Sequence, residues 1–159
     1  MAELISGTTL ATKIRAEIKA ETEDLKALGM IPGLAVILVG DDPASQVYVR
    51  NKTKACEELG FYHEQYNLPA NISENEVLEL INELNTSDKI HGILVQAPLP
   101  KGLDFSNIID HISPNKDVDA FHPYNVGRIM IGDFDFLPCT PAGVMELIHE
   151  AGVSVEGKT

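Results

Sequence analysis

The segment LAVILVG, residues 34–40, is a short continuous apolar run that is rich in β-branched side chains. Such a run predicts a strand that is buried on both faces, as strands are in a parallel sheet. The next residues, GDDP at 40–43, end this strand and start a helix, with Asp42 as the N-cap and Pro43 at the first helical position. A buried strand that leads directly into a capped helix favours an α/β fold.

Helix and strand patterns alternate on both sides of this segment. Apolar spacing and capping signals predict helices over residues 10–28, 43–59, 73–84, 103–112 and 141–152, and strands over 34–40, 61–69 and 90–96. Residues 114–136 are rich in turn-forming residues, so we expect them to be irregular. This alternation predicts an open, mainly parallel sheet flanked by helices, with ligands beyond the carboxyl ends of the strands.

The composition fits one acidic domain. The chain has 159 residues, 44% of them hydrophobic, and a formal net charge of -12. Because nothing offsets phosphate repulsion, we expect no nucleic-acid partner. We also expect no membrane partner, since no apolar run is long enough to span a bilayer. The lack of a signal-like start and the two cysteines, Cys56 and Cys139, predict a cytoplasmic protein with reduced thiols.

The predicted helix at 43–59 contains a lysine in its apolar face. That face carries Tyr48, Lys52, Ala55, Cys56 and Leu59, whereas Arg50, Lys54, Glu57 and Glu58 share the opposite, solvated face. The amine of Lys52 either reaches out to water or lies in a cleft, where burial can bring a lysine pKa toward neutral and suit it to acid–base catalysis. Tyr48 is either an ordinary core residue or a platform for a flat ligand.

Further polar residues follow the later strands. Gln96 ends the strand at 90–96, where its amide either caps the next loop or holds Lys52 or a substrate heteroatom. Asp117 and Asp119 alternate in KDVDA, and one carboxylate could accept paired hydrogen bonds from a ring edge. The histidines and cysteines lack metal-ligand spacing, so we expect no metal site. The match of residues 152–159 to the P-loop pattern is rejected, because it follows a helix rather than a strand.

Together these stretches resemble one enzyme family, methylenetetrahydrofolate dehydrogenase/methenyltetrahydrofolate cyclohydrolase. The resemblance rests on GDDPASQVYVRNKTKACEELG (40–60), VQAPLP (95–100), PNKDVDAFHP (114–123) and PCTPAGV (138–144). It implies NADP-dependent oxidation (NAD in some members) of 5,10-methylenetetrahydrofolate, followed by hydrolysis of the methenyl cation to 10-formyltetrahydrofolate. It also implies a homodimer for the full-length enzyme, and a fold like the N-terminal domain of amino-acid-dehydrogenase-like proteins.

The resemblance assigns roles to individual residues. Lys52 matches the catalytic lysine, Gln96 the glutamine that tunes it, Tyr48 the tyrosine on the folate rings and Asp119 the aspartate at the pterin edge. Further expected substrate contacts are Val95, Ala97 and Pro98, and Thr140 is expected near the cofactor. Two departures from the family pattern are Ala97, where leucine is common, and Ala120, where glycine is usual.

The resemblance also predicts how the chain is divided. We expect residues 1–139 to form the folate-binding catalytic domain, and residues 140–159 to lead toward an NADP-binding Rossmann domain that this sequence lacks. We therefore expect a small-molecule folate substrate, weak or absent dehydrogenase activity, and no cofactor site within the chain. Two alternatives are a folate-binding fragment without turnover and the first domain of a shikimate-type dehydrogenase. The second leaves PCTPAG unexplained.

Overall fold

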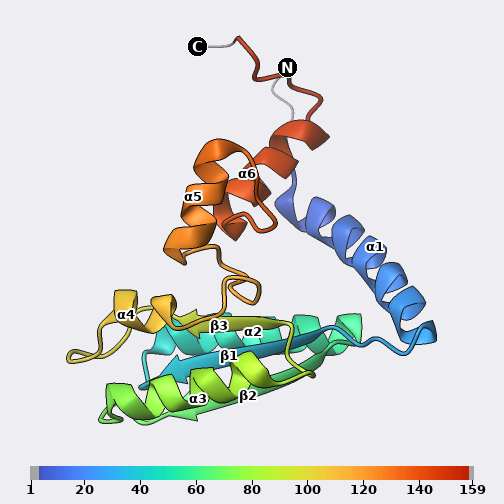
Figure 1. Ribbon diagram of the computed structural model, residues 1–159. Helices are drawn as coiled ribbons and strands as arrows, with labels where there is room; N and C mark the ends of the chain where they lie inside the picture. The colour runs from blue at the N-terminus through green and yellow to red at the C-terminus, as the bar shows by residue number, and fades with distance from the viewer. Residues whose placement is uncertain (1–3, 158–159) are drawn as a thin grey trace.

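A computed structural model describes residues 4–157 and shows an α/β arrangement (Figure 1). The elements, in chain order, are α1 (Gly7–Ala27), β1 (Gly33–Val39), α2 (Pro43–Leu59), β2 (Tyr62–Leu68), α3 (Glu74–Thr86), β3 (Gly92–Gln96), α4 (Phe105–Asp110), α5 (Pro123–Ile131) and α6 (Cys139–Glu150). The open parallel sheet flanked by helices is confirmed. No helix within the described range has both the length and the hydropathy to cross a bilayer.

The three strands form a parallel sheet in the order β2-β1-β3. The central strand β1 pairs with β2 from Gly33 opposite Tyr62, and with β3 from Leu34 opposite Gly92. β2 lies at an edge of the sheet, and its residues are half-buried or exposed. By contrast, β1 is almost wholly buried, because helices cover both of its faces.

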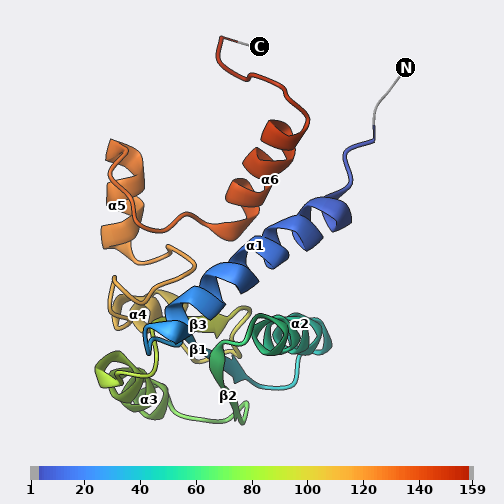
Figure 2. The same cartoon turned by 90° about the vertical axis from the view of Figure 1, so that its right-hand side faces the viewer.

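Two apolar clusters lie on opposite faces of the sheet, under helices that Figure 2 shows on either side of it. The larger cluster joins the sheet to α3 and α4 through residues such as Ile37, Ile81, Ile93 and Ile108. The smaller cluster consists of Val36, Leu38, Val49 and Leu94 and joins the sheet to α2. Because strand side chains alternate between faces, neighbouring residues of β1 and β3 enter different clusters.

The capping signals that predicted α2 and α3 are confirmed. Asp42 accepts a hydrogen bond from the Ser45 backbone N–H at 2.7 Å, and Gly60 ends α2 with φ of 76°. Ser73 and Glu76 form a reciprocal capping box at the start of α3. These local hydrogen bonds fix where both helices begin, and therefore which side chains α2 presents to the sheet.

The prediction that residues 114–136 are irregular was partly wrong. Residues Pro123–Ile131 form α5, which begins with a cap from His122 and a proline in its first turn. It ends at Gly132, which has a φ of 77°. Arg128 forms ion pairs with Asp133 and Asp135 in the following loop. The helix signals were present, but the many turn-forming residues around them masked a short helix.

The final helix starts two residues earlier than predicted. Pro141 stands in the first turn of α6, where a missing N–H leaves no helical hydrogen bond unmade. Helices α1 and α6 lie side by side above the sheet (Figure 1), and Lys13 pairs with Glu150 at 3.1 Å. The expected boundary between residues 139 and 140 falls in the first turn of α6. The division into two parts stays a prediction.

Candidate functional site

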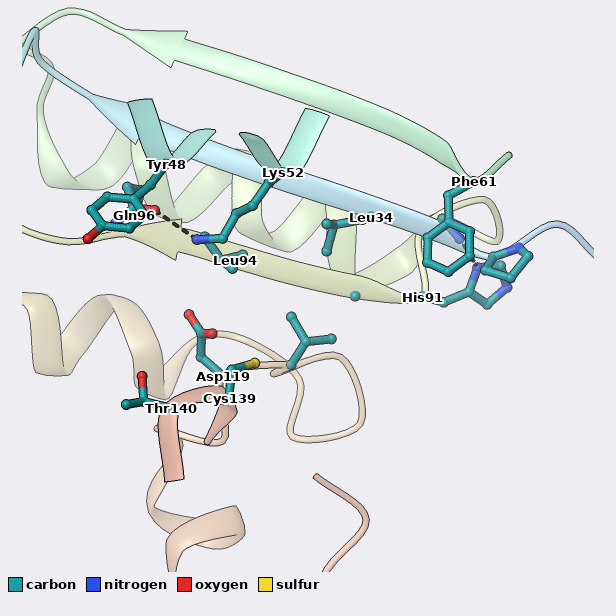
Figure 3. A pocket seen from close by; sticks show the side chains of 14 residues that line it. Leu34, Tyr48, Lys52, Phe61, His91, Leu94, Gln96, Asp119, Cys139 and Thr140 are labelled. Carbon is teal, nitrogen blue, oxygen red and sulfur yellow. Dashed lines mark hydrogen bonds between the residues drawn. The ribbon is translucent and has the colours of Figure 1, made fainter. Parts of the chain in front are cut away.

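A cavity of about 760 Å³ lies beside α2, along the face of the sheet that carries the smaller cluster (Figure 3). Tyr48 and Gln96 lie at one end of it, and Phe61 and His91 lie at the other. Its lining consists of Pro32, Gly33, Leu34, Tyr48, Lys52, Phe61, His91, Gly92, Leu94, Gln96, Val118, Asp119, Cys139 and Thr140. The surface is mostly apolar, with a few polar groups, as is usual for sites that bind small molecules.

The amine of Lys52 points toward β3 rather than into open water. Its Nζ donates a hydrogen bond to Oε1 of Gln96 at 2.9 Å. The Nε2 of Gln96 donates to the carbonyl oxygen of Ala97 at 2.8 Å, and Ser45 Oγ donates to the same oxygen at 3.4 Å. Because a carbonyl oxygen only accepts, this pattern turns the Gln96 amide so that its oxygen faces the amine. Gln96 thus has both of the contacts weighed for it, to the loop and to Lys52.

Tyr48 lies at the rim of the cavity and not in the core. Its side chain is 62% exposed, whereas Val49 is 1% exposed and packs between α2 and the sheet. The interpretation of Tyr48 as a core residue is therefore wrong, because the buried stripe of α2 runs one residue further round the helix. An exposed phenol ring beside a cavity is placed to cover a flat ligand.

Asp119 extends into the cavity from the opposite side to Lys52 (Figure 3). Burial raises the pKa of the Asp119 carboxyl, the Lys52 ammonium acts in the opposite direction, and the charge of Asp117 raises this pKa further. Ala120 follows with φ of 56°, the left-handed conformation that glycine adopts most easily. Ala120, which stands where the family usually has glycine, therefore adopts a conformation that favours glycine.

The structure does not bring every predicted contact residue into the cavity. Val95 is 2% exposed and belongs to the cluster under α3, because side chains alternate along β3 and only Leu94 and Gln96 face α2. Ala97 and Pro98 are exposed beyond the end of the strand and are not part of the cavity wall. Substrate contacts by these three residues stay predictions. Thr140 does line the cavity.

The amine of Lys52 and the carboxyl of Asp119 thus face each other across an apolar floor formed by Leu34, Leu94 and Val118. This arrangement suits a planar ligand whose edge donates hydrogen bonds to a carboxylate. Comparison with known proteins identifies the family to which the chain belongs. The profile described as tetrahydrofolate dehydrogenase/cyclohydrolase, catalytic domain, matches residues 5–119. The chain belongs to this tetrahydrofolate dehydrogenase/cyclohydrolase family.

Two bacterial members of this family share more than half of their aligned residues with the chain. The bifunctional protein FolD of Acetivibrio thermocellus is 57% identical over 157 residues, and that of Geotalea daltonii is 55% identical over 158. These matches take in 99% of the present chain, which spans 55% and 56% of the respective relatives. The chain therefore corresponds to about half the length of these tetrahydrofolate dehydrogenase/cyclohydrolase proteins.

Solved structures of the family have the same fold. The bifunctional enzyme FolD of Campylobacter jejuni superposes with a TM-score of 0.95 at 50% identity, covering 98% of this chain and 56% of that one. The FolD enzyme of Trypanosoma brucei, solved with NADP cofactor and inhibitor, gives a TM-score of 0.94 at 37% identity. That match covers 99% of this chain and 54% of the Trypanosoma chain.

The far end of the cavity in this family member consists of residues that were not predicted from sequence. Pro32, Phe61 and His91 precede strands, so the rule that ligands bind beyond the carboxyl ends pointed away from them. The His91 ring is held there because its Nδ1 accepts a hydrogen bond from the Gly33 N–H at 3.0 Å. The apolar floor could have been found from the two-residue period of β1 and β3, once the face toward α2 was known.

Proposed function

We propose that this chain is the folate-binding catalytic half of a methylenetetrahydrofolate dehydrogenase/methenyltetrahydrofolate cyclohydrolase. The observation that carries the proposal is the Lys52–Gln96 hydrogen bond at 2.9 Å, in a cavity shared with Asp119 and Tyr48. Relatives that are 57% and 55% identical are bifunctional FolD proteins, which supports the same chemistry here. In the proposed complex the pterin edge binds Asp119 and the ring system packs against Tyr48.

The hydrolytic reaction needs only water as co-substrate. Water adds to the methenyl carbon of the cation, a carbon–nitrogen bond to the ring breaks, and 10-formyltetrahydrofolate and one proton are released. The Lys52 amine assists either by accepting a proton from the attacking water or by protonating the departing ring nitrogen. Gln96 keeps the amine in place for this transfer, since its Oε1 is already oriented by the loop carbonyl.

The oxidation step in the parent enzyme uses NADP as hydride acceptor, but the residues present here do not fit that cofactor. The turn between β1 and α2 carries Asp41 and Asp42, and Asp42 already occupies the helix N-terminus by accepting from Ser45. Carboxylates at that position repel a pyrophosphate. The sequence contains no G-x-G-x-x-G. We therefore expect little or no NADP reduction by these 159 residues.

Methenyltetrahydrofolate hydrolysis, followed by the decay of its absorbance, tests the proposal. Lys52→Met should lower acceleration above the spontaneous rate by about a hundredfold or more while leaving the fold intact. Lys54→Met is the matched control, because Lys54 lies on the exposed side of the same helix and pairs with Glu58 at 3.8 Å. Near-normal hydrolysis by folded Lys52→Met would refute the assignment. Tetrahydrofolate binding without acceleration by the unaltered chain would favour a non-catalytic folate-binding module.

We further propose a cytoplasmic location, which the free thiols of Cys56 and Cys139 support. A homodimer stays a prediction for the full-length enzyme.

A further inference from the structure

The segment that carries Asp119 is held against β3 by backbone contacts. The backbone of Asp117 forms an isolated parallel bridge with Ile93, and the Ile93 N–H donates to the Lys116 carbonyl oxygen at 2.7 Å. Val118 packs closely over Gly92, where an added Cβ would lie 2.6 Å from its Cγ1. These contacts fix one side of the segment and leave its other side to be held from elsewhere.

The carboxylate of Asp117 holds that other side. It is 1% exposed, and its Oδ2 accepts hydrogen bonds from the His122 backbone N–H at 2.8 Å and from Asn125 Nδ2 at 3.0 Å. Asn125 is 5% exposed, and its Nδ2 also donates to the carbonyl oxygen of Pro114 at 2.9 Å. One amide of α5 therefore joins the start of the segment to the residue two positions before Asp119.

Both donors to Asp117 are uncharged. Within residues 4–157 no lysine, arginine or histidine side chain forms an ion pair with this carboxylate. A buried carboxylate without a cationic partner costs free energy unless its hydrogen bonds are well placed. Neither Asp117 nor Asn125 lines the cavity, so this pair acts on a ligand through the neighbouring residues that do, Val118 and Asp119.

We propose that Asp117 and Asn125 are positioning residues whose hydrogen bonds hold the turn at 117–120 so that the Asp119 carboxyl faces Lys52 across the cavity. This role rests on the proposed function, in which Asp119 binds the folate ring. The left-handed Ala120 and the capped start of α5 continue the same turn, since Ala120 N–H donates to the Asp117 carbonyl oxygen at 3.2 Å. Loss of the side-chain bonds lets the turn move and misplaces the carboxyl.

Tetrahydrofolate titration, by calorimetry well below each unfolding midpoint, tests this role in the 159-residue chain. Asn125→Ala should weaken binding about tenfold, because a hydrogen bond to a buried carboxylate is lost. Asp117→Asn keeps an acceptor oxygen at the same place and should bind within about threefold of the unaltered chain. Asn107→Ala is the matched control: Asn107 of α4 donates to Glu74 at 2.7 Å, away from the cavity, and its loss should leave affinity unchanged.

Equal affinity of folded Asn125→Ala and the unaltered chain would overturn the proposal. Should Asn125→Ala unfold at the assay temperature, Asn125→Leu has a side chain of similar size without a donor, and a measurable loss of affinity is expected from it. Unchanged affinity in folded Asn125→Leu would count against the role in the same way.

A second readout separates this proposal from the proposed function. If the unaltered chain does not bind tetrahydrofolate, the proposed function fails. The positioning role is then decided without ligand, by ¹³C NMR titration of the Asp119 carboxyl. The other ionisable side chains that line the cavity are Lys52, Tyr48, His91 and Cys139. Asn125→Ala should lower the pKa of Asp119 by exposing it, and Asn107→Ala should leave it unchanged. An unmoved Asp119 titration in Asn125→Ala would overturn the positioning role.

Discussion

The position of Asp119 in the cavity costs the folded protein stability at neutral pH. Asp119 is held where burial raises the pKa of its carboxyl above that of an exposed aspartate, so ionising it costs more in the folded than in the unfolded protein. Because the pKa of Asp119 is higher in the folded protein, protonated Asp119 contributes to stability, and this contribution is fully present below the pKa that Asp119 has in the unfolded chain. This contribution is lost as the pH rises through the folded pKa. At neutral pH, therefore, the charge of Asp119 lowers the free energy of unfolding.

Asp119→Asn should raise the free energy of unfolding at pH 7 and weaken folate binding. The gain should shrink as the pH falls, because below the reference value of 3.8 the aspartate is protonated in both states and resembles asparagine. Urea unfolding of both proteins between pH 3 and pH 7 measures this difference. A gain that is independent of pH, or a loss of stability at pH 7, would contradict the interpretation.

Ala120, the residue after Asp119, has an unfavourable backbone conformation. It is 1% exposed and has a φ of 56°. Ala120→Val should lower the free energy of unfolding by about 2 kcal/mol, because a β-branched side chain fits the left-handed region poorly. Ala120→Gly, which fits it well, serves as the control and should change stability by less than about 1 kcal/mol. Chemical denaturation would show the contrast, and equal stability of the two variants would argue against strain here.

At the scale of secondary structure, the position of the cavity follows from the start of β3. Gly92 lets the 117–120 segment approach the strand, so the first residue of β3 controls how deep Asp119 sits. Gly92→Ala should cost about 1–3 kcal/mol through the close contact with Val118 and should also weaken tetrahydrofolate binding. Thermal unfolding and calorimetric titration report the two effects. Unchanged affinity in a destabilised variant would show that the segment adjusts without moving the carboxyl.

The helices and strands also show which parts of the fold could be predicted from the sequence. The buried strand at 34–40 and the caps at Asp42 and Ser73 act through neighbours in the chain, so they could be predicted. The choice of Val49 over Tyr48 for the core could not, because it depends on how α2 is rotated against β1 and β3. Local pattern defines a helix face only to within about one residue.

The same distinction applies to the candidate site. Lys52 was found because it lies in the apolar face of its helix, and Gln96 because it is a polar residue at the end of an apolar strand. Their contact follows from the parallel order of β1 and β3. The hydrogen bond from Asn125 to Asp117 joins a loop to α5, a helix that was not predicted from sequence. Contacts of this kind depend on tertiary packing and leave no periodic signal in the chain.

For the whole molecule, the sheet with its covering helices is better packed than the part formed by α5 and α6. The core lies around the sheet, whereas α6 has no buried residue and α5 exposes Met130 and Ile131 at 81% and 76%. The cavity lies between these two parts, with Lys52 and Gln96 on the sheet side and Asp119, Cys139 and Thr140 on the other (Figure 3). A ligand that bridges them would therefore draw the two parts together.

The most direct test of folate binding across this cavity is a tetrahydrofolate titration of the ¹⁵N-labelled chain followed by NMR. The side-chain amide of Gln96 and the backbone amides of residues 117–120 should shift together along one saturable curve, because both sides of the cavity would contact one ligand. Shifts confined to one side, or saturation at residues remote from Lys52 while Gln96 stays unmoved, would contradict the account.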